Sequence, residues 1–394
     1  MLAALLALML LACGTHTAQE RSPAPAAPPW LDASPQPVVD RFNPPAGLPA
    51  ELRSEPFVQW RDPSVLREGD GYAMWAALTV RRGGRGTSIY RLGSHDGLSW
   101  QAQNDGLPVL APGSNRRGEF DWYGVTSPAV VRSGSEYHMY YATRHEPRPR
   151  EGRPTLTLGH AVSRDGVAFT KRGELHSLTS VVGHREGNPW GWRARSEPAA
   201  LFHDGDFFLY FEDVRCRRKD CDGGPETIRG ISLARSRDGH EFRQVGEGPV
   251  LLQSDSFRGR QGWEGYSRPC VYHDGTWFQL FVEVVRVTDH GSFAQAIAHY
   301  RSRDGVSFEE VRANVLTTRG HPWAQASLGA PSVVAGSDAL RLWYAGDNLD
   351  WRVHREEDIR EGRVRVGIGL ALLRAGRGSA PTGQPARRSG PEPR

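Results

Sequence analysis

A hairpin-like segment repeats five times along this chain of 394 residues. Each copy has proline in its third position, then a short apolar run, a polar turn and an apolar-aromatic run, which is typical of a β-hairpin. The copies cover 61–78 (RDPSVLREGDGYAMWAAL), 126–143 (TSPAVVRSGSEYHMYYAT), 196–213 (SEPAALFHDGDFFLYFED), 267–284 (SRPCVYHDGTWFQLFVEV) and 329–346 (GAPSVVAGSDALRLWYAG). Their prolines follow one another at intervals of 65, 70, 71 and 62 residues. Five similar β units therefore make up most of the chain.

A second motif, Ser-x-Asp-Gly before an aromatic residue, keeps the same period. It occurs as SHDGLSW, SRDGVAF, SRDGHEF and SRDGVSF, beginning at Ser94, Ser163, Ser236 and Ser302. Asp-Gly favours a turn, and the aromatic residue begins another strand. The fifth unit, VGIGLALLRAG at 366–376, keeps the strand and lacks the turn. About four strands per unit, none able to bury both faces alone, predict an all-β fold: a five-bladed β-propeller over 50–376 with about four antiparallel strands per blade.

Charge and motif content exclude several classes of function. The 49 basic and 45 acidic residues give a net charge of +4, and no basic block alternates with aromatic residues, so nucleic acid is not an expected partner. None of the 14 histidines forms a His-x-x-x-His pair, so no metal or other cofactor is predicted, with a structural ion in a central channel left as an open alternative. A Gly-x-Ser-x-Gly elbow is absent from the sequence, which disfavours serine hydrolases. We expect a monomer.

The N-terminal residues carry the signature of export. Residues 2–12 (LAALLALMLLA) are apolar, too short to span a bilayer comfortably, and lead into Cys13. The LLAC stretch resembles the lipobox of bacterial lipoproteins, which implies cleavage before Cys13 and lipidation of its thiol. No Lys or Arg precedes the apolar run, so a plain signal peptide remains the alternative. We expect a lipid-anchored protein of the bacterial cell envelope, or a secreted one if the lipobox is not used, with a proline-rich tether over 13–49 and a disordered tail over 377–394.

The remaining cysteines fit an exported protein. Cys216 and Cys221 bracket a polar stretch, CRRKDC, and in an oxidising compartment they most simply form a local disulfide. Cys270 follows a repeat proline in an apolar run, which is more typical of a buried small hydrophobe than of a nucleophile.

The repeats, the Arg-Asp-Pro of the first unit and the Ser-x-Asp-Gly turns together resemble the five-bladed propeller glycoside hydrolases. These are the arabinanases, xylosidases and fructosidases of families 43, 32 and 68, with the mannoside phosphorylase family 130 as a cousin. The resemblance covers most of the chain as architecture and implies an oligosaccharide or glycoside substrate. Sialidase repeats are a weaker match because they place one more residue between Asp and the aromatic residue.

In a propeller, the residue before each repeat proline should point into a shared central funnel. Converging charges in a concave site are typical of binding or chemistry. These five residues are Asp62, Ser127, Glu197, Arg268 and Ala330.

Glycoside cleavage needs one ionised and one protonated carboxyl group. The resemblance implies that Asp62 is the base or nucleophile, and Arg61 beside it could hold it ionised, although the two could instead only brace the blade entrance. The resemblance also implies that Glu197 stands at the position of an auxiliary Asp of those families, although this chain has Glu there instead of Asp. The predicted acid is Glu264 in WEGYSRPCVY, where family 43 often has Glu-Gly-Pro directly; Asp121, or Glu212 with Asp213, are alternatives.

Aromatic residues upstream of the inner strands are expected on loops at the funnel rim, where sugar rings could stack on them. They are Trp60, Trp122, Tyr123, Trp192, Trp263 and Tyr266. A structural role between blades is the alternative for about half of them. The predicted substrate-binding set is Trp60, Arg61, Asp121, Trp122, Ser127, Asp213, Tyr266 and Arg268. The sequence favours a cell-envelope glycoside hydrolase, with a non-catalytic carbohydrate-binding lipoprotein or a protein-interaction platform as rivals.

Overall fold

The structure of the chain is a computed structural model. The structure describes residues 30–55, 57–80, 86–113, 119–144, 156–178, 181–182, 192–216, 227–252, 264–288, 291–319, 321–348, 357–358, 361 and 363–374.

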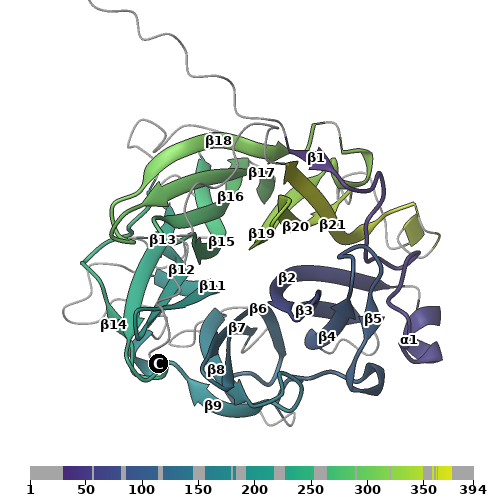
Figure 1. The fold of residues 1–394 in the computed structure, drawn as a ribbon, viewed down its shortest axis with the longest axis horizontal. Coiled ribbons are helices and arrows are strands. Elements are labelled where there is room, and N and C mark those ends of the chain that lie inside the picture. The colour runs from purple at the N-terminus through teal and green to yellow at the C-terminus, as the bar shows by residue number, and fades with distance from the viewer. Residues whose placement is uncertain are drawn as a thin grey trace, which may run out of the picture.

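Five antiparallel sheets stand around a central axis, as predicted (Figure 1). Blade 1 holds β2 (Val58–Glu68), β3 (Gly71–Val80), β4 (Ser88–Ser94) and β5 (Gln101–Ala102), and blade 2 holds β6 (Gly124–Ser133), β7 (Glu136–Arg144), β8 (Leu156–Ser163) and β9 (Thr170–Glu174). Blade 3 holds β10 (Val181–Val182), β11 (Trp192–His203), β12 (Asp206–Cys216), β13 (Thr227–Ser236) and β14 (Arg243–Gln244). Blade 4 holds β15 (Glu264–His273), β16 (Phe278–Thr288), β17 (Gly291–Ser302) and β18 (Glu309–Thr317), and blade 5 holds β19 (Ser327–Ala335), β20 (Ala339–Asp347), β21 (Val366–Arg374) and β1 (Leu31–Asp32).

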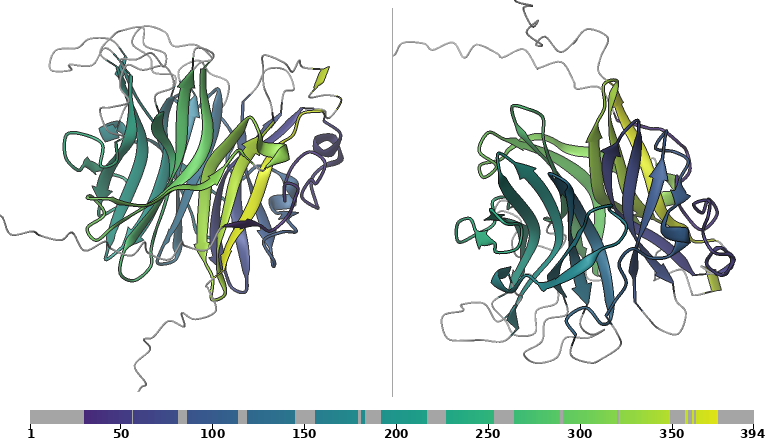
Figure 2. Two further views of the ribbon diagram at one scale, coloured as in Figure 1. Left: turned by 90° about the horizontal axis from the view of Figure 1, so that it is seen from above. Right: turned by 60° about the horizontal axis from the view of Figure 1, so that its bottom comes forward.

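Helical structure is sparse and lies outside the blades. The α-helix α1 spans Ala50–Ser54, and short 3₁₀ turns span Asn104–Gly106, His176–Leu178 and Pro322–Ala324. Seen from the side, the blades form a short cylinder with α1 on its flank (Figure 2). Among the described helices, none is long and apolar enough to cross a membrane.

The N-terminal segment closes the ring, which corrects the prediction that the whole of 13–49 is a tether. β1 pairs with β21 as the fourth strand of blade 5, and Val39 forms a further bridge to Ile368. Val38, Val39 and Leu48 are buried in the same core as blades 1 and 5. The apolar residues among the prolines pack on the propeller, so the part of the predicted tether that the structure describes belongs to the folded domain.

Polar contacts fasten β1 to blade 5. Asp32 Oδ1 accepts a hydrogen bond from the Tyr344 hydroxyl (2.9 Å), and Asp32 Oδ2 lies 3.1 Å from His321 Nε2. The hydrogen bond with Asp32 raises the pKa of His321 above its usual value. The contact between Asp32 and His321 is therefore strongest when His321 carries a proton.

Each Ser-x-Asp-Gly motif forms the same compact turn. At Ser163 the hydroxyl donates to Asp165 Oδ1 (2.8 Å), and that oxygen also accepts from the N–H groups of Val167 and Ala168 (both 2.8 Å). These backbone bonds lower the pKa of Asp165 to about 2. Gly166 has φ +72°, a conformation that glycine adopts without strain. The same carboxylate bonds recur in the turns that begin at Ser94, Ser236 and Ser302.

An aromatic side chain of one blade donates a hydrogen bond into the turn of the next blade. The donors occupy equivalent positions on the second strands of blades 1, 2, 3 and 5 and are 0% exposed, and the acceptor is the carbonyl of the turn glycine. The four pairs are Trp75 with Gly166 (2.9 Å), Tyr140 with Gly239 (2.8 Å), Tyr210 with Gly305 (2.7 Å) and Trp343 with Gly97 (3.0 Å). The repeated turns therefore accept a hydrogen bond that joins two neighbouring blades, and this hydrogen bond is named here the latch.

The seam between blades 4 and 5 is closed differently. The equivalent residue of blade 4 is Phe281, which has no donor, and blade 5 lacks the Ser-x-Asp-Gly turn. Trp30, next to β1, packs edge to face on Phe281 with ring centroids 6.1 Å apart. The N-terminal segment thus covers the one seam for which the sequence provides no latch.

We expect Tyr210→Phe to lower the free energy of unfolding by about 1 to 3 kcal/mol, because it leaves the buried Gly305 carbonyl without its donor. Chemical denaturation of both proteins measures this difference. Tyr90→Phe is the matched control, since Tyr90 is a buried residue and no hydrogen bond joins its hydroxyl to another described residue. Equal losses in the two variants would contradict the latch.

Candidate functional site

Each inner strand bulges at the residue before its repeat proline. Strand pairing shifts there in all five blades, and two residues of the inner strand face one of its neighbour. The residue before proline has φ between 39° and 52°, in the left-handed region. For non-glycine residues this costs roughly 1 to 3 kcal/mol each, and such strain often occurs at functional sites. The residues that adopt it are Asp62, Ser127, Glu197, Arg268 and Ala330, named here the channel ring.

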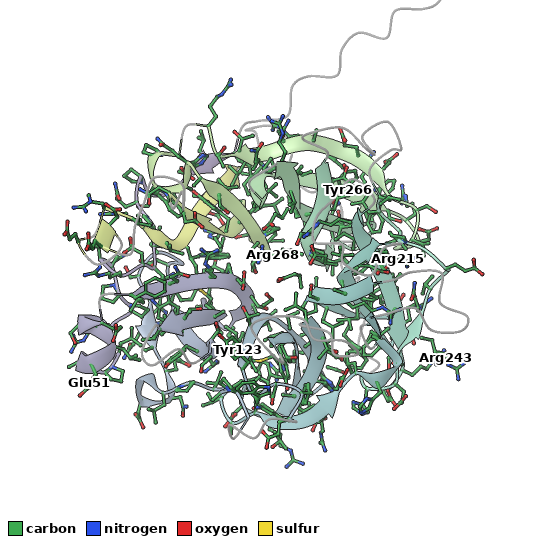
Figure 3. The ribbon with its side chains drawn as sticks, turned by 180° about the vertical axis from the view of Figure 1, so that it is seen from behind. Glu51, Tyr123, Arg215, Arg243, Tyr266 and Arg268 are labelled. Carbon is green, nitrogen blue, oxygen red and sulfur yellow. The ribbon has the colours of Figure 1, made fainter. Side chains whose placement is uncertain are left out.

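The channel ring and its five prolines line a small cavity on the axis, as the sequence predicts. Its volume is about 30 Å³, which suits water rather than a sugar. A second cavity of about 300 Å³ continues along the axis beyond the prolines, and its walls are mainly apolar. Figure 3 shows Arg268 beside this central channel. The cavity inside the ring is therefore too small to hold a sugar ring.

Asp62 is held in its ionised form. Its Oδ2 accepts hydrogen bonds from Thr126 (2.8 Å) and Ser127 (3.1 Å), and its Oδ1 lies 3.2 Å from Arg268 Nε. Burial of the carboxyl works to raise its pKa, but Arg268, Thr126, Arg61 and Ser127 outweigh this effect and hold the pKa below its usual value. Asp62 is therefore an anion at neutral pH.

Glu197 lies beside Asp62, but its pKa is shifted in the opposite direction. Its Oε2 is hydrogen-bonded to Ser127 Oγ, the same hydroxyl that contacts Asp62, and lies 3.3 Å from Arg268 Nε. Burial, together with the nearby charges of Asp62 and Glu212, raises its pKa to about 7, although Arg268 and Ser127 counteract the rise. One carboxyl group of the ring is thus ionised and the other is half protonated near neutral pH.

Arg268 is the shared cation of the ring. Its side chain is 31% exposed, against 9% for Asp62 and 10% for Glu197. Its Nη1 donates to both oxygens of Glu283, at 3.1 and 3.2 Å. Arg268 therefore presents more surface to a ligand than either carboxylate does.

Charged residues on the second strands lie around the ring. Glu283 was not predicted from the sequence, and Glu212 was predicted only as an alternative acid. Glu283 on β16 binds Arg268, and Glu212 on β12 accepts hydrogen bonds from Ser196 (2.8 Å) and Arg229. Both Glu residues pair with the residue two positions before a repeat proline, at the same level of their blades. A charged residue at this strand position, where the other blades have Ala, was the signal that could have identified Glu283.

Arg61 reaches the neighbouring blade rather than its own Asp. Its Nη2 lies 3.0 Å from Asp347 Oδ2 on β20. Arg61 still helps to lower the pKa of Asp62, in the direction that the sequence predicts. Arg268 contributes more to this lowering.

Two predicted rim aromatics lie in the blade cores instead. Trp60 is on β2, 0% exposed, and packs edge to face on Tyr90 at 5.8 Å. Tyr266 is on β15, 7% exposed, and shares a hydrogen bond with the Tyr300 hydroxyl (2.7 Å). Figure 3 shows Tyr266 farther from the channel than Arg268. The prediction of rim loops was wrong for both, because the inner strands begin several residues before the prolines and alternate side chains into the core.

Two predicted acidic residues are also placed away from the ring. Asp121 is 2% exposed, lies 2.5 Å from Lys171 Nζ, and lines a separate pocket in blade 2. Asp213 is 0% exposed and binds Arg215 (2.6 Å) and Ser232 (2.8 Å). Both carboxylates are paired within a blade, and neither residue lines the channel cavity.

Of the remaining predicted residues, Trp122 is described, and the others are described only in part or not at all. Trp122 precedes β6, half-buried, with its ring 5.5 Å from that of Tyr123. Glu264 begins β15 and pairs in the sheet with Arg286, but its side chain lies outside the described residues, as do those of Trp192 and Cys216. Cys13, Cys221 and Trp263 lie outside the described residues altogether.

Cys270 lies within the described ranges and packs against blade 5. Cys270 is a free thiol whose Sγ accepts from the Val333 N–H (3.2 Å), and burial raises its pKa to about 11. It is an unreactive packing residue, as the sequence indicates. Within these ranges no three His, Cys, Asp or Glu side chains come together as a metal site.

Comparison with solved structures shows where this architecture recurs. The structure of BT0996 in its RGII complex matches with a TM-score of 0.59 at 14% identity, over 89% of this chain and 92% of its own. Zg3597, a family 117 glycoside hydrolase of the marine bacterium Zobellia galactanivorans, matches with 0.54 at 14% identity, over 83% and 88%. The alpha-L-arabinanase of Cellvibrio cellulosa matches with 0.53 at 15% identity, over 80% and 91%. The chain therefore shares the five-bladed fold of glycoside hydrolases, as the repeats predict.

Comparison of sequences finds less similarity than comparison of structures does. No family model matches the chain. The Mycobacterium tuberculosis (strain CDC 1551 / Oshkosh) protein named "Uncharacterized protein MT1551" is 24% identical over 273 residues, which cover 68% of this chain and 76% of that protein.

Proposed function

We propose that this protein is a glycoside hydrolase that cleaves its substrate at the charged side of the channel ring. The observation that carries the proposal is the pair Asp62 and Glu197, two adjacent carboxyl groups whose pKa values are shifted in opposite directions. Such a divergence is how glycosidases prepare one ionised and one protonated carboxyl. The fold shared with glycoside hydrolases, and with BT0996 in its RGII complex, supports a carbohydrate substrate.

In this proposal Asp62 is the ionised base or nucleophile and Glu197 holds the proton. Both carboxylates lie close to one nitrogen, Arg268 Nε, at 3.2 and 3.3 Å. This closeness favours the separation of roughly 5 to 5.5 Å found in retaining enzymes over the roughly 6.5 to 9.5 Å of inverting ones. Arg268 would contact the substrate directly. Glu264, the acid proposed from the sequence, is the alternative proton donor.

A non-catalytic carbohydrate-binding protein is the second candidate. The blade 4 strand has Ser267 and Arg268 before Pro269, where the resembled family 43 enzymes often have Glu and Gly. Arg268 also occupies the space between the two carboxylates. A protein that kept the ring and lost the acid would bind sugars there without cleaving them.

A hydrolysis screen separates these two functions. The purified protein is incubated with a panel of aryl glycosides and plant and microbial oligosaccharides, and products are measured by chromatography. Turnover would establish the enzyme and identify its sugar. No turnover together with a ligand-dependent rise in melting temperature would favour the binding protein.

If Glu197 donates the proton, kcat/KM is expected to fall as the pH rises through about 7, by about tenfold for each further pH unit. Above that pH the carboxyl is ionised and has no proton to give. A pH–rate profile of the wild type measures the decline, and Glu197→Gln should abolish it. A decline that survives in Glu197→Gln but disappears in Glu264→Gln would transfer the role to Glu264.

We also propose that the enzyme works in the bacterial cell envelope, anchored through a lipid on Cys13. The LLAC stretch and the proline-rich residues after it support this location. Growth with a radiolabelled fatty acid, comparing the full chain with Cys13→Ser, tests the anchor.

A further inference from the structure

One cation serves three carboxylates in the proposed site. Arg268 lies within ion-pair distance of Asp62, Glu197 and Glu283. A guanidinium has five N–H donors in a fixed plane, so a bond to one partner restricts the bonds it can make to the others. The distribution of its hydrogen bonds therefore influences how strongly each carboxylate is stabilised in its ionised form.

Arg268 is hydrogen-bonded mainly to Glu283. Its Nη1 donates to both Glu283 oxygens at 3.1 and 3.2 Å, whereas its Nη2 reaches Glu197 Oε1 only at 3.5 Å. Its Nε faces Asp62 and Glu197 but donates no hydrogen bond to any described residue. Glu283 therefore accepts the shorter hydrogen bonds from the guanidinium, and Glu197 accepts the longer one.

Glu283 is itself firmly held. It lies on β16, 4% exposed, and its Oε2 accepts the Ala330 N–H at 3.0 Å. The adjacent Gly329 leaves room for this carboxylate, because a Cβ at that position would overlap Glu283 Oε2. The bulge of blade 5 therefore holds the buried Glu283 carboxylate, which the second strand of blade 4 supplies.

We propose that Glu283 is a positioning residue, which anchors Arg268 on the blade 4 side of the ring and so limits the pairing of Arg268 with Glu197. The inference rests on the proposed proton-holding role of Glu197. Glu283 contacts Arg268 and not the reacting atoms, so it acts through the guanidinium.

Two effects of removing the Glu283 charge have the same sign. Arg268 would be free to pair fully with Glu197, and a nearby negative charge would be lost. Both favour the ionised form of Glu197 and lower its pKa. The other charged or hydrogen-bonding groups around it stay in place in this comparison; they are Asp62, Thr126, Ser127, Glu212 and Arg229, with Arg61 and Asp347 at the neighbouring seam.

The test is a pH titration of Glu197 by ¹³C NMR in protein with labelled glutamate, with Glu197→Gln used to assign its signal. In Glu283→Gln, which keeps the shape and an acceptor for Ala330, we expect the midpoint to fall by at least one pH unit. Glu68→Gln is the matched control, since Glu68 is also paired with an arginine, Arg91, at 2.5 Å but lies outside the channel ring. An unchanged or raised midpoint, or an equal fall in the control, would overturn the inference.

A second variant covers the case in which Glu283→Gln does not fold. Glu283→Asp keeps the charge but withdraws it by one methylene, so a smaller fall in the same direction is expected, and no fall would again overturn the inference. The titration does not depend on turnover. If the hydrolysis screen fails while the midpoint moves, the proposed function fails and the positioning role stands; if the screen succeeds, the alkaline limb of kcat/KM should move with the midpoint.

Discussion

Asp62→Asn is expected to lower kcat/KM for the substrate found in the screen by about 10²- to 10⁴-fold, the usual contribution of a positioned acid, base or nucleophile. The amide keeps the size of the side chain and can still accept a hydrogen bond from Thr126. It cannot act as a base or nucleophile, because it carries no negative charge. Substrate affinity, measured by calorimetry, should change little.

Asp338→Asn is the control for this prediction. Asp338 is also paired with an arginine, Arg341, at 2.9 Å, but its side chain is 66% exposed and lies outside the ring. Full activity in Asp338→Asn with lost activity in Asp62→Asn supports the assignment. Retained turnover in Asp62→Asn would exclude Asp62 as the base or nucleophile.

Arg268→Met should have the largest effect on stability, with a loss of about 3 to 5 kcal/mol in the free energy of unfolding at pH 8. The substitution leaves Asp62, Glu197 and Glu283 buried beside one another without their shared cation. Folding then raises the pKa of these carboxyl groups above their values in the unfolded chain. Groups with a raised pKa in the folded state favour folding at low pH, and this contribution is lost as the pH rises through the folded pKa.

The loss should therefore be smaller at pH 5 than at pH 8, and urea denaturation at both values measures it. Arg235→Met removes an exposed ion pair with Asp206 and is expected to cost at most about 1 kcal/mol at either pH. A loss in Arg268→Met that is the same at both pH values would show that lost packing, and not uncompensated charge, is responsible.

The sequence predicted the fold well because its signals are local. A hairpin needs only alternating apolar residues and a polar turn, and the Asp165 turn needs only residues within five positions of one another. Repetition of these units about every 65 residues then implies a closed array. The same reasoning located the channel ring, since the residue before each proline occupies one equivalent place in five similar blades.

Predictions failed where a side chain depends on its neighbours in space. Trp60 and Tyr266 stand just upstream of the prolines, but the strands begin before them and turn both rings into the core. Trp30 lies among prolines and looks like part of a tether, yet it packs on Phe281, about 250 residues away in the chain. A single sequence offers no local signal for such a contact.

What the sequence determined by itself is the five-bladed architecture and the set of residues that converge on the axis, because strand period and turn chemistry act over a few residues. What only the tertiary structure decided is how those residues share charge. Arg268 divides its contacts among Asp62, Glu197 and Glu283, which come from three blades and two strand positions. Burial and the distances between these groups set their protonation, and neither quantity exists until the blades close into a ring.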